Sequence, residues 1–138
     1  MKFLSTILLA LLTFSSVLAQ KGNQKITVTV INATSNDGTI KFALSDKENF
    51  LIGKPIQAKE AKIENGKSVV VFENVPAGEY AITCFHDKNS NGKMDFQPSG
   101  MPMEDYGASN NVMNFGPPRY DDAKFTITNK DVSLDIKF

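Results

Sequence analysis

The sequence is poor in the residues that carry redox and transition-metal chemistry. It contains one cysteine, Cys84, one histidine, His86, and no tryptophan among its 138 residues. A single cysteine excludes an internal disulfide, and one histidine with one cysteine is too small a set for a transition-metal centre. The lack of tryptophan also weighs against a carbohydrate-binding platform of exposed aromatic rings.

Neither sign of charge is in excess. Fifteen Lys and Arg residues balance fifteen Asp and Glu residues, so the formal net charge is zero at neutral pH. Nucleic-acid binding depends on phosphate neutralisation by a basic surface, and a polybasic membrane-surface site needs a similar cluster. We therefore expect no nucleic-acid partner and no membrane-surface site that is built on positive charge.

A long apolar run occurs only at the beginning of the chain. Lys2 precedes an almost entirely apolar stretch at residues 3–14, and small residues precede a cleavage point after Ala19. This arrangement is typical of a secretory signal peptide over residues 1–19. The alternative is a transmembrane anchor, but the apolar run is too short and no charged stop follows it. We expect one domain at residues 20–138, secreted or periplasmic, with no membrane insertion after signal cleavage.

The rest of the chain alternates apolar and polar residues with the period of a β-strand. One segment is more continuously apolar and predicts a central strand, and another, at 55–63, fits helix and strand equally well. Convincing helical periodicity is lacking, and short strands at this spacing predict an all-β sandwich or barrel, of which we favour a β-sandwich of about seven strands. The predicted strands are 25–31, 39–45, 68–75 (the continuously apolar one), 79–86, 124–128 and 132–138.

Turn-forming residues separate these segments. The sequences SNDG at 35–38 and ENG at 64–66 are hairpin signals, because Asn and Gly tolerate positive φ. Pro76 and Gly78 form a sharp corner just before Tyr80. In immunoglobulin-like sandwiches a tyrosine at such a corner bonds its hydroxyl back across the turn, and we expect the same contact here.

One long stretch, residues 97–121, shows no regular pattern. It mixes Pro, Gly and Asn with methionine and aromatic residues. Long structureless loops are rare in compact domains unless they are functional or disordered, and disordered segments are poor in aromatic residues. We therefore expect one long packed loop, whose apolar side chains either plug one end of the sandwich or line a ligand surface.

The segment HDKNSNGKMD at 86–95 has the spacing of a calcium loop. Calcium takes about six to eight oxygen ligands, and an EF-hand loop supplies them from positions 1, 3, 5, 7, 9 and 12 with glycine at position 6. Gly92 occupies the sixth position, but Pro98 occupies the twelfth and supplies no carboxylate. The ligands expected at the other positions are Asp87, Asn89, Asn91, Lys93 (through its carbonyl) and Asp95.

The missing ligand has to come from elsewhere in the chain. Glu104 and Asp105 lie a few residues further on, and Glu104 is our first choice. So few carboxylates predict a weak affinity, in the millimolar range of extracellular modules. The alternative is a plain hairpin turn, since Asn and Gly both tolerate positive φ. The regular Asp–Asn–Asn–Asp alternation favours calcium over the turn.

Three blocks of sequence occur in order: AGEYAITCFHDKNSNGKMD, GMPMEDYGASNN and PPRYDDAKF. Together they resemble a bacterial family of small exported proteins, domain of unknown function 2141. The resemblance implies export and an all-β, immunoglobulin-like fold, and it implies no activity. It further suggests that the second block folds back over the first, so that Pro102 and Gly107 shape the return, Glu104 completes the ion shell and Tyr106 packs on it.

Catalytic alternatives can also be drawn from these residues. Cys84 and His86 would share one face of a strand, which could pair a thiol with a base, although a strand-capping role for His86 is simpler. Two carboxylates near the loop could serve glycoside hydrolysis, but carboxylates bound to an ion are poor acids. The sequence thus predicts an exported, non-catalytic calcium-binding module with a protein or glycan ligand. The alternative is a small extracytoplasmic hydrolase that uses His86 and Glu104.

Overall fold

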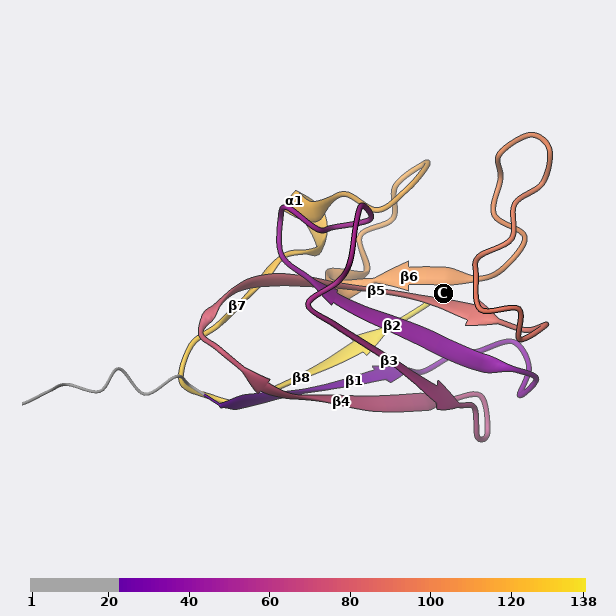
Figure 1. Cartoon of the computed structure of the whole chain (residues 1–138). Helices are drawn as coiled ribbons and strands as arrows, with labels where there is room; N and C mark the ends of the chain where they lie inside the picture. Colours follow the sequence, from indigo (N-terminus) through magenta and orange to yellow (C-terminus); the bar gives the residue numbers. More distant parts are fainter. Residues whose placement is uncertain (1–22) are drawn as a thin grey trace, which may run out of the picture.

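The computed structural model describes residues 23–138, and the signal peptide predicted at 1–19 lies outside them. The described residues form two β-sheets packed face to face (Figure 1). The elements are β1 (Gln24–Val30), β2 (Thr39–Ser45), β3 (Gln57–Lys62), β4 (Ser68–Val75), β5 (Gly78–Asp87), β6 (Tyr106–Ala108), the 3-10 turn η1 (Ser109–Asn111), α1 (Tyr120–Ala123), β7 (Phe125–Ile127) and β8 (Val132–Ile136). The all-β class and the sandwich are confirmed.

The smaller sheet has three strands in the order β4-β1-β8. β1 runs antiparallel to β4 and parallel to β8. The prediction of a central strand at 68–75 is wrong, because β4 forms an edge of this sheet. Its apolar run still obeys the period of two: Ser68, Val70 and Phe72 are buried, whereas Val69, between the first two, is 51% exposed. The number of hydrogen-bonded neighbours is set by the tertiary fold and not by the local apolar content.

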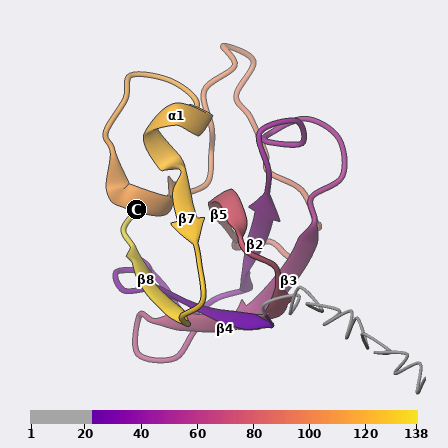
Figure 2. The same cartoon turned by 90° about the vertical axis from the view of Figure 1, so that its left-hand side faces the viewer.

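The larger sheet has the order β3-β2-β5-β6, and β7 pairs with the first residues of β5. β5 is the longest strand and its centre. It pairs with β2 along one edge and, along the other, with β7 at Gly78–Tyr80 and with β6 at Thr83–Phe85. Figure 2 shows this sheet end-on, with β5 between β7 and β2. The far end of β5 therefore projects at one end of the sandwich, where Asp87 closes the strand.

The core fills the space between the two sheets. Alternate residues of β1, β2, β4 and β5 point into it, as the period-two pattern predicts. Cys84 is buried among them, as expected for a free cysteine in a strand pattern. The largest fully buried side chains are Phe42, Phe72, Ile26, Ile40, Leu44, Ile82, Ile127, Ile136, His86, Val28, Val30 and Val75.

The turns bear out two of the three expectations. The Tyr80 hydroxyl donates to the carbonyl oxygen of Pro76 at 2.9 Å, which is the predicted corner contact. The ENG turn is a two-residue hairpin closed by pairing of Glu64 with Lys67. The hairpin predicted at 35–38 is wrong, because β1 and β2 lie in different sheets and do not pair. This turn instead carries the chain from one sheet to the other.

The stretch 97–121 is more regular than expected, since β6, η1 and the first residues of α1 lie within it. β6 has only three residues with glycine at its centre, so no alternation could reveal it. Gly107 is required there for space: a Cβ atom would lie 2.6 Å from Cγ2 of Ile136. Within residues 23–138 no helix is long and apolar enough to cross a membrane.

Candidate metal centre

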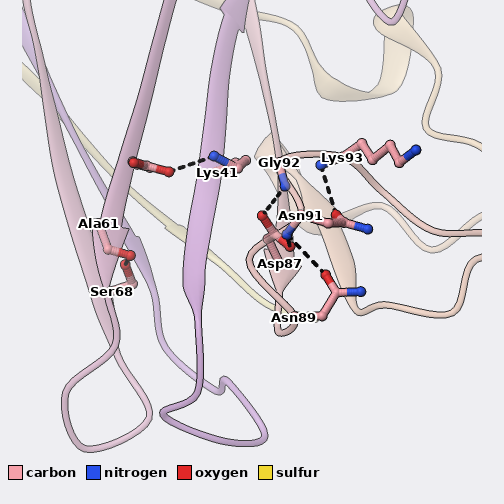
Figure 3. A network of polar contacts seen from close by, with 9 residues as sticks. Lys41, Ala61, Ser68, Asp87, Asn89, Asn91, Gly92 and Lys93 are labelled. Atoms are coloured by element: carbon pink, nitrogen blue, oxygen red, sulfur yellow. Dashed lines mark hydrogen bonds and ion pairs between the residues drawn. The ribbon is translucent and has the colours of Figure 1, made fainter.

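Asp87 joins the end of β5 to the polar loop that follows. Its side chain is buried, and its two carboxylate oxygens accept main-chain hydrogen bonds from the loop. The N–H of Asn91 donates to Oδ1 at 3.1 Å and the N–H of Gly92 donates to Oδ2 at 2.9 Å (Figure 3). The loop therefore wraps around this carboxylate, which is fixed at the rim of the larger sheet.

The next two predicted ligands continue the same pattern of short-range bonds. Oδ1 of Asn89 accepts from the N–H of Asn91 at 3.3 Å, and Oδ1 of Asn91 accepts from the N–H of Lys93 at 3.1 Å (Figure 3). The Lys93 side chain extends away from Asp87 in the same view. The contact of Lys93 with this cluster is therefore made by its main-chain N–H, and its role as a carbonyl ligand stays a prediction.

Asp95 ties the loop together from its other end. Nδ2 of Asn89 donates to one carboxylate oxygen at 2.8 Å, and Nδ2 of Asn91 donates to both, at 2.9 and 2.8 Å. Hydrogen bonds from Asn89 and then Asn91 hold the pKa of the Asp95 carboxyl below its usual value, because they stabilise its charged form. Asp87, Asn89, Asn91 and Asp95 thus form one continuous polar cluster.

Glu104 reaches this cluster from beyond a short hairpin. Phe96 pairs with Pro102, and the N–H of Met103 donates to the carbonyl oxygen of Asp95 at 2.9 Å, so the chain returns to its starting point. The N–H of Asp95 then donates to Oε2 of Glu104 at 3.3 Å. The sequence-based choice of Glu104 therefore names a residue that lies against the loop.

The second carboxylate oxygen of Glu104 finds no hydrogen-bond partner among residues 23–138. The residue is only 8% exposed, and its Oε1 atom is buried without a hydrogen bond. Nearly all buried polar atoms in proteins are hydrogen-bonded, so each exception needs a cause. A buried carboxylate oxygen beside Asp95, in a cluster of oxygen-bearing side chains, has the chemistry of an incomplete ligand shell.

The predicted ligands all offer oxygen atoms, which are the ligands that hard cations prefer. Among residues 23–138, no three His, Cys, Asp or Glu side chains gather closely enough to hold a metal on their own. Asp87, Asp95 and Glu104 therefore do not make a tight carboxylate cluster, and Asn89 and Asn91 lie between them. Calcium accepts such a mixture of carboxylate, amide and carbonyl oxygens, whereas thiolate and imidazole sites suit other metals.

His86 lies on the inner side of the centre. Its ring is fully buried, and Nε2 is 2.7 Å from the carbonyl oxygen of Asp37. The main-chain N–H of His86 donates to the carbonyl oxygen of Asp105, and the main-chain carbonyl oxygen of His86 accepts from the N–H of Lys88 in the loop. The ring also stacks on Phe138, with 6.4 Å between centroids. His86 therefore closes the end of β5, which fits the capping role expected for it.

Sequence reasoning missed the part played by the 35–38 turn. Asp37 binds the His86 ring, and Gly38 lies directly against the main chain of Asp87. A Cβ atom at Gly38 would overlap the Asp87 carbonyl oxygen, and φ is +68° there. Only glycine meets both conditions. The SNDG motif was the available signal, but it was interpreted as a local hairpin and not as a packing surface for the loop.

Cys84 and His86 share the inner face of β5, as predicted, but both are buried. Burial raises the pKa of the Cys84 thiol, and its Sγ atom lies 3.8 Å from the carbonyl oxygen of Gly107. A thiol with a raised pKa is a poor nucleophile. This pair therefore belongs to the packing of the sandwich.

Comparison with known proteins places these residues in a family. Residues 28–135 match the family model described as "Uncharacterized protein conserved in bacteria (DUF2141)". The chain belongs to the DUF2141 family. This confirms the resemblance expected from the three sequence blocks. The match runs from within β1 to within β8 and includes every candidate metal ligand of this DUF2141 domain. No curated protein and no solved structure matches the chain.

Proposed function

We propose that this protein is an exported calcium-binding β-sandwich module that acts by binding and not by catalysis. The observation that carries the proposal is the buried, unpartnered Oε1 atom of Glu104 beside Asp95. The ligands would be Asp87, Asn89, Asn91, Lys93 through its carbonyl, Asp95 and Glu104. Each is an oxygen donor, and a carbonyl or carboxylate oxygen can accept a main-chain bond and still have a lone pair for a cation.

Calcium fits this donor set better than magnesium. Calcium tolerates irregular shells of mixed oxygen ligands, whereas magnesium demands octahedral geometry and keeps several waters. Bound calcium would neutralise the carboxylates and cross-link residues 87–95 with Glu104. What the chain itself supplies is a loop already folded around Asp87 and Asp95 by its own hydrogen bonds. The ordering that remains on binding is therefore small.

Two further points support the rest of the proposal. The apolar stretch at 3–14 followed by small residues supports export through a cleaved signal peptide. Burial of Cys84 and His86 supports a role without catalysis, because neither side chain faces solvent. The hydrolase alternative gains no support, since its base would be His86, whose Nε2 atom is engaged with Asp37 inside the protein.

Thermal unfolding with and without calcium tests the proposal. Binding to the folded state alone stabilises it by mass action, so about 10 mM calcium with a dissociation constant near 1 mM adds about 1.4 kcal/mol. We expect the melting temperature to rise by about 5 °C relative to EDTA. The rise should be absent in Asp95→Asn and much smaller when magnesium replaces calcium. An unchanged melting temperature in calcium would contradict the proposal.

A further inference from the structure

Large apolar side chains are exposed in three loops and almost nowhere else in the described residues. Of the ten exposed large apolar residues among residues 23–138, nine lie in the loops 46–56, 88–105 and 112–119. The tenth is Val69 on β4. Met113 and Phe115 are essentially fully exposed. The nine are Leu51, Ile52, Ile56, Phe96, Met101, Met103, Val112, Met113 and Phe115.

The three loops rise from the same side of the molecule. Both cartoon views show them together above the larger sheet, on the side away from β1 and β4 (Figures 1 and 2). They surround an apolar hollow of about 590 Å³, whose lining includes no charged residue. A second hollow of about 560 Å³ over the sheet shares Leu51 and Met94 with the first. Exposed apolar side chains gathered around a hollow in this way point to an interaction site.

The tips of the loops carry no charge. No Asp, Glu, Lys or Arg occurs at 49–53, 96–103 or 112–118. Charged residues of both signs border these tips: Glu48, Asp95 and Glu104 are acidic neighbours, and three basic residues lie beside them. Two of the basic residues, at positions 54 and 93, form no ion pair with any of residues 23–138, and the third is paired with Asp122. The three basic residues are Lys54, Lys93 and Arg119.

One tip is connected directly to the candidate metal centre. Residues 96–103 fill the interval between Asp95 and Glu104, which are both proposed ligands. The hydrogen bond from the N–H of Asp95 to Glu104 closes the base of the tip, together with the bond from the N–H of Met103 to the carbonyl oxygen of Asp95. Without a cation the base of the tip therefore carries two carboxylates whose charge is not neutralised. With calcium bound, their charge is neutralised and the base of the tip is cross-linked.

We propose that the three tips dock the protein peripherally on an anionic lipid bilayer when calcium is bound; this rests on the calcium function proposed above. Apolar tips bordered by Lys54, Lys93 and Arg119 match a surface in which hydrocarbon lies beneath negative headgroups. Calcium removes the repulsion that Asp95 and Glu104 would exert on those headgroups. Docking of this kind requires no spanning segment.

Other occupants fit the same observations less well. A small apolar ligand in the hollow would leave Ile52, Met103 and Met113 exposed, since none of them lines it. A second copy or another protein would need a surface of complementary shape, whereas the most exposed side chains stand on three separate tips. A fluid bilayer requires no such match in shape.

Sedimentation with lipid vesicles tests the proposal. We expect the protein to sediment with phosphatidylcholine vesicles that contain phosphatidylglycerol in the presence of calcium, and to remain in solution in EDTA. The double variant Met113→Ser, Phe115→Ser should bind about 100-fold more weakly, because each side chain loses about tenfold in affinity when its apolar burial is removed. Val69→Ser is the matched control and should bind like the parent, since Val69 belongs to the other sheet.

Calcium titration calorimetry on the same preparations separates this proposal from the one on which it rests. A protein that binds calcium but ignores the vesicles overturns the docking and leaves the calcium function intact. Equal sedimentation in calcium and EDTA overturns the dependence on calcium. A protein that binds no calcium overturns the calcium function and this coupling with it. A dimer that dissociates on Phe115→Ser, or binding of a soluble apolar dye without vesicle binding, overturns the lipid as the occupant.

Discussion

The main-chain N–H of Asp95 donates to Oε2 of Glu104 at 3.3 Å, across the base of a hairpin that neither residue belongs to. This bond joins the polar loop after β5 to the chain nine positions further on. It leaves the second carboxylate oxygen of Glu104 buried and without a partner. Glu104 is therefore the residue whose substitution best tests whether the centre binds calcium.

Replacing Glu104 by Gln separates a ligand from a purely structural residue. Calcium affinity depends on the number of charged ligands, so we expect Glu104→Gln to weaken it about tenfold or more. In EDTA the same variant should be no less stable than the parent, because a buried unpaired charge is lost. Calorimetry measures the first effect and urea unfolding the second.

Asp105→Asn is the control for this experiment. Asp105 is the neighbouring carboxylate, partly exposed, and it pairs with Lys88 at 3.4 Å and not with the loop cluster. Its removal should change calcium affinity less than about twofold. Unchanged affinity in Glu104→Gln, or an equal loss in both variants, would count against Glu104 as a ligand.

Gly38→Ala should be far more costly than a glycine substitution with the same backbone strain. Gly38 and Gly100 both have positive φ, at +68° and +86°, but only Gly38 lies against another part of the chain. We expect a loss of about 1 kcal/mol for Gly100→Ala from strain, and about 3 kcal/mol or more for Gly38→Ala from strain plus overlap with Asp87. Urea unfolding of both variants measures the difference, and equal losses would refute the packing role of the 35–38 turn.

Tyr80→Phe tests the corner contact before β5. The hydroxyl of Tyr80 donates to Pro76 from a largely buried position, so its loss should cost about 1 kcal/mol of stability. Tyr106→Phe is the comparison, since its hydroxyl makes a longer bond of 3.3 Å at the exposed surface and should cost less than about 0.5 kcal/mol. A smaller effect at Tyr80 than at Tyr106 would be inconsistent with this assignment.

Cys84 should be inert while the protein is folded. Burial raises the pKa of its thiol above the ordinary value of about 8.5, so little thiolate forms at neutral pH. We expect a thiol reagent to label it only after denaturation. The unfolded chain ionises above about pH 8.5 and then binds fewer protons than the folded state, so this group lowers stability as pH rises further. Cys84→Val should reduce that alkaline loss in urea unfolding, and rapid labelling of the native protein would contradict the prediction.

The alternation of apolar and polar residues was enough to predict the strands that bury one face in the core. The bounds of β2 and β4 agree with the predicted segments at 39–45 and 68–75, because alternation is a property of the strand itself. It was not enough for β6, whose three residues are held in place by pairing with β5. Which strand stands at an edge likewise depends on partners distant in sequence, and this is why β4 was assigned to the wrong place.

In the candidate centre too, some contacts could be predicted from the sequence and others could not. The spacing of Asp87, Asn89, Asn91 and Asp95 predicted that these side chains would lie together, because all four belong to one short stretch of chain, residues 87–95. The approach of Glu104 followed from its nearness in sequence and from the family resemblance. The contact of Gly38 with Asp87 joins residues 49 positions apart, and nothing in either segment encodes it locally.

The parallel pairing of β1 with β8 has a consequence for how the chain is made. Ile26 pairs with Val132, 106 positions later, so the first strand gains its second neighbour only when the last strand has been synthesised. A ribosome delivers β1 first and β8 last, and until then β1 keeps an unprotected edge. A prematurely terminated chain would retain that open edge, which is a template for aggregation.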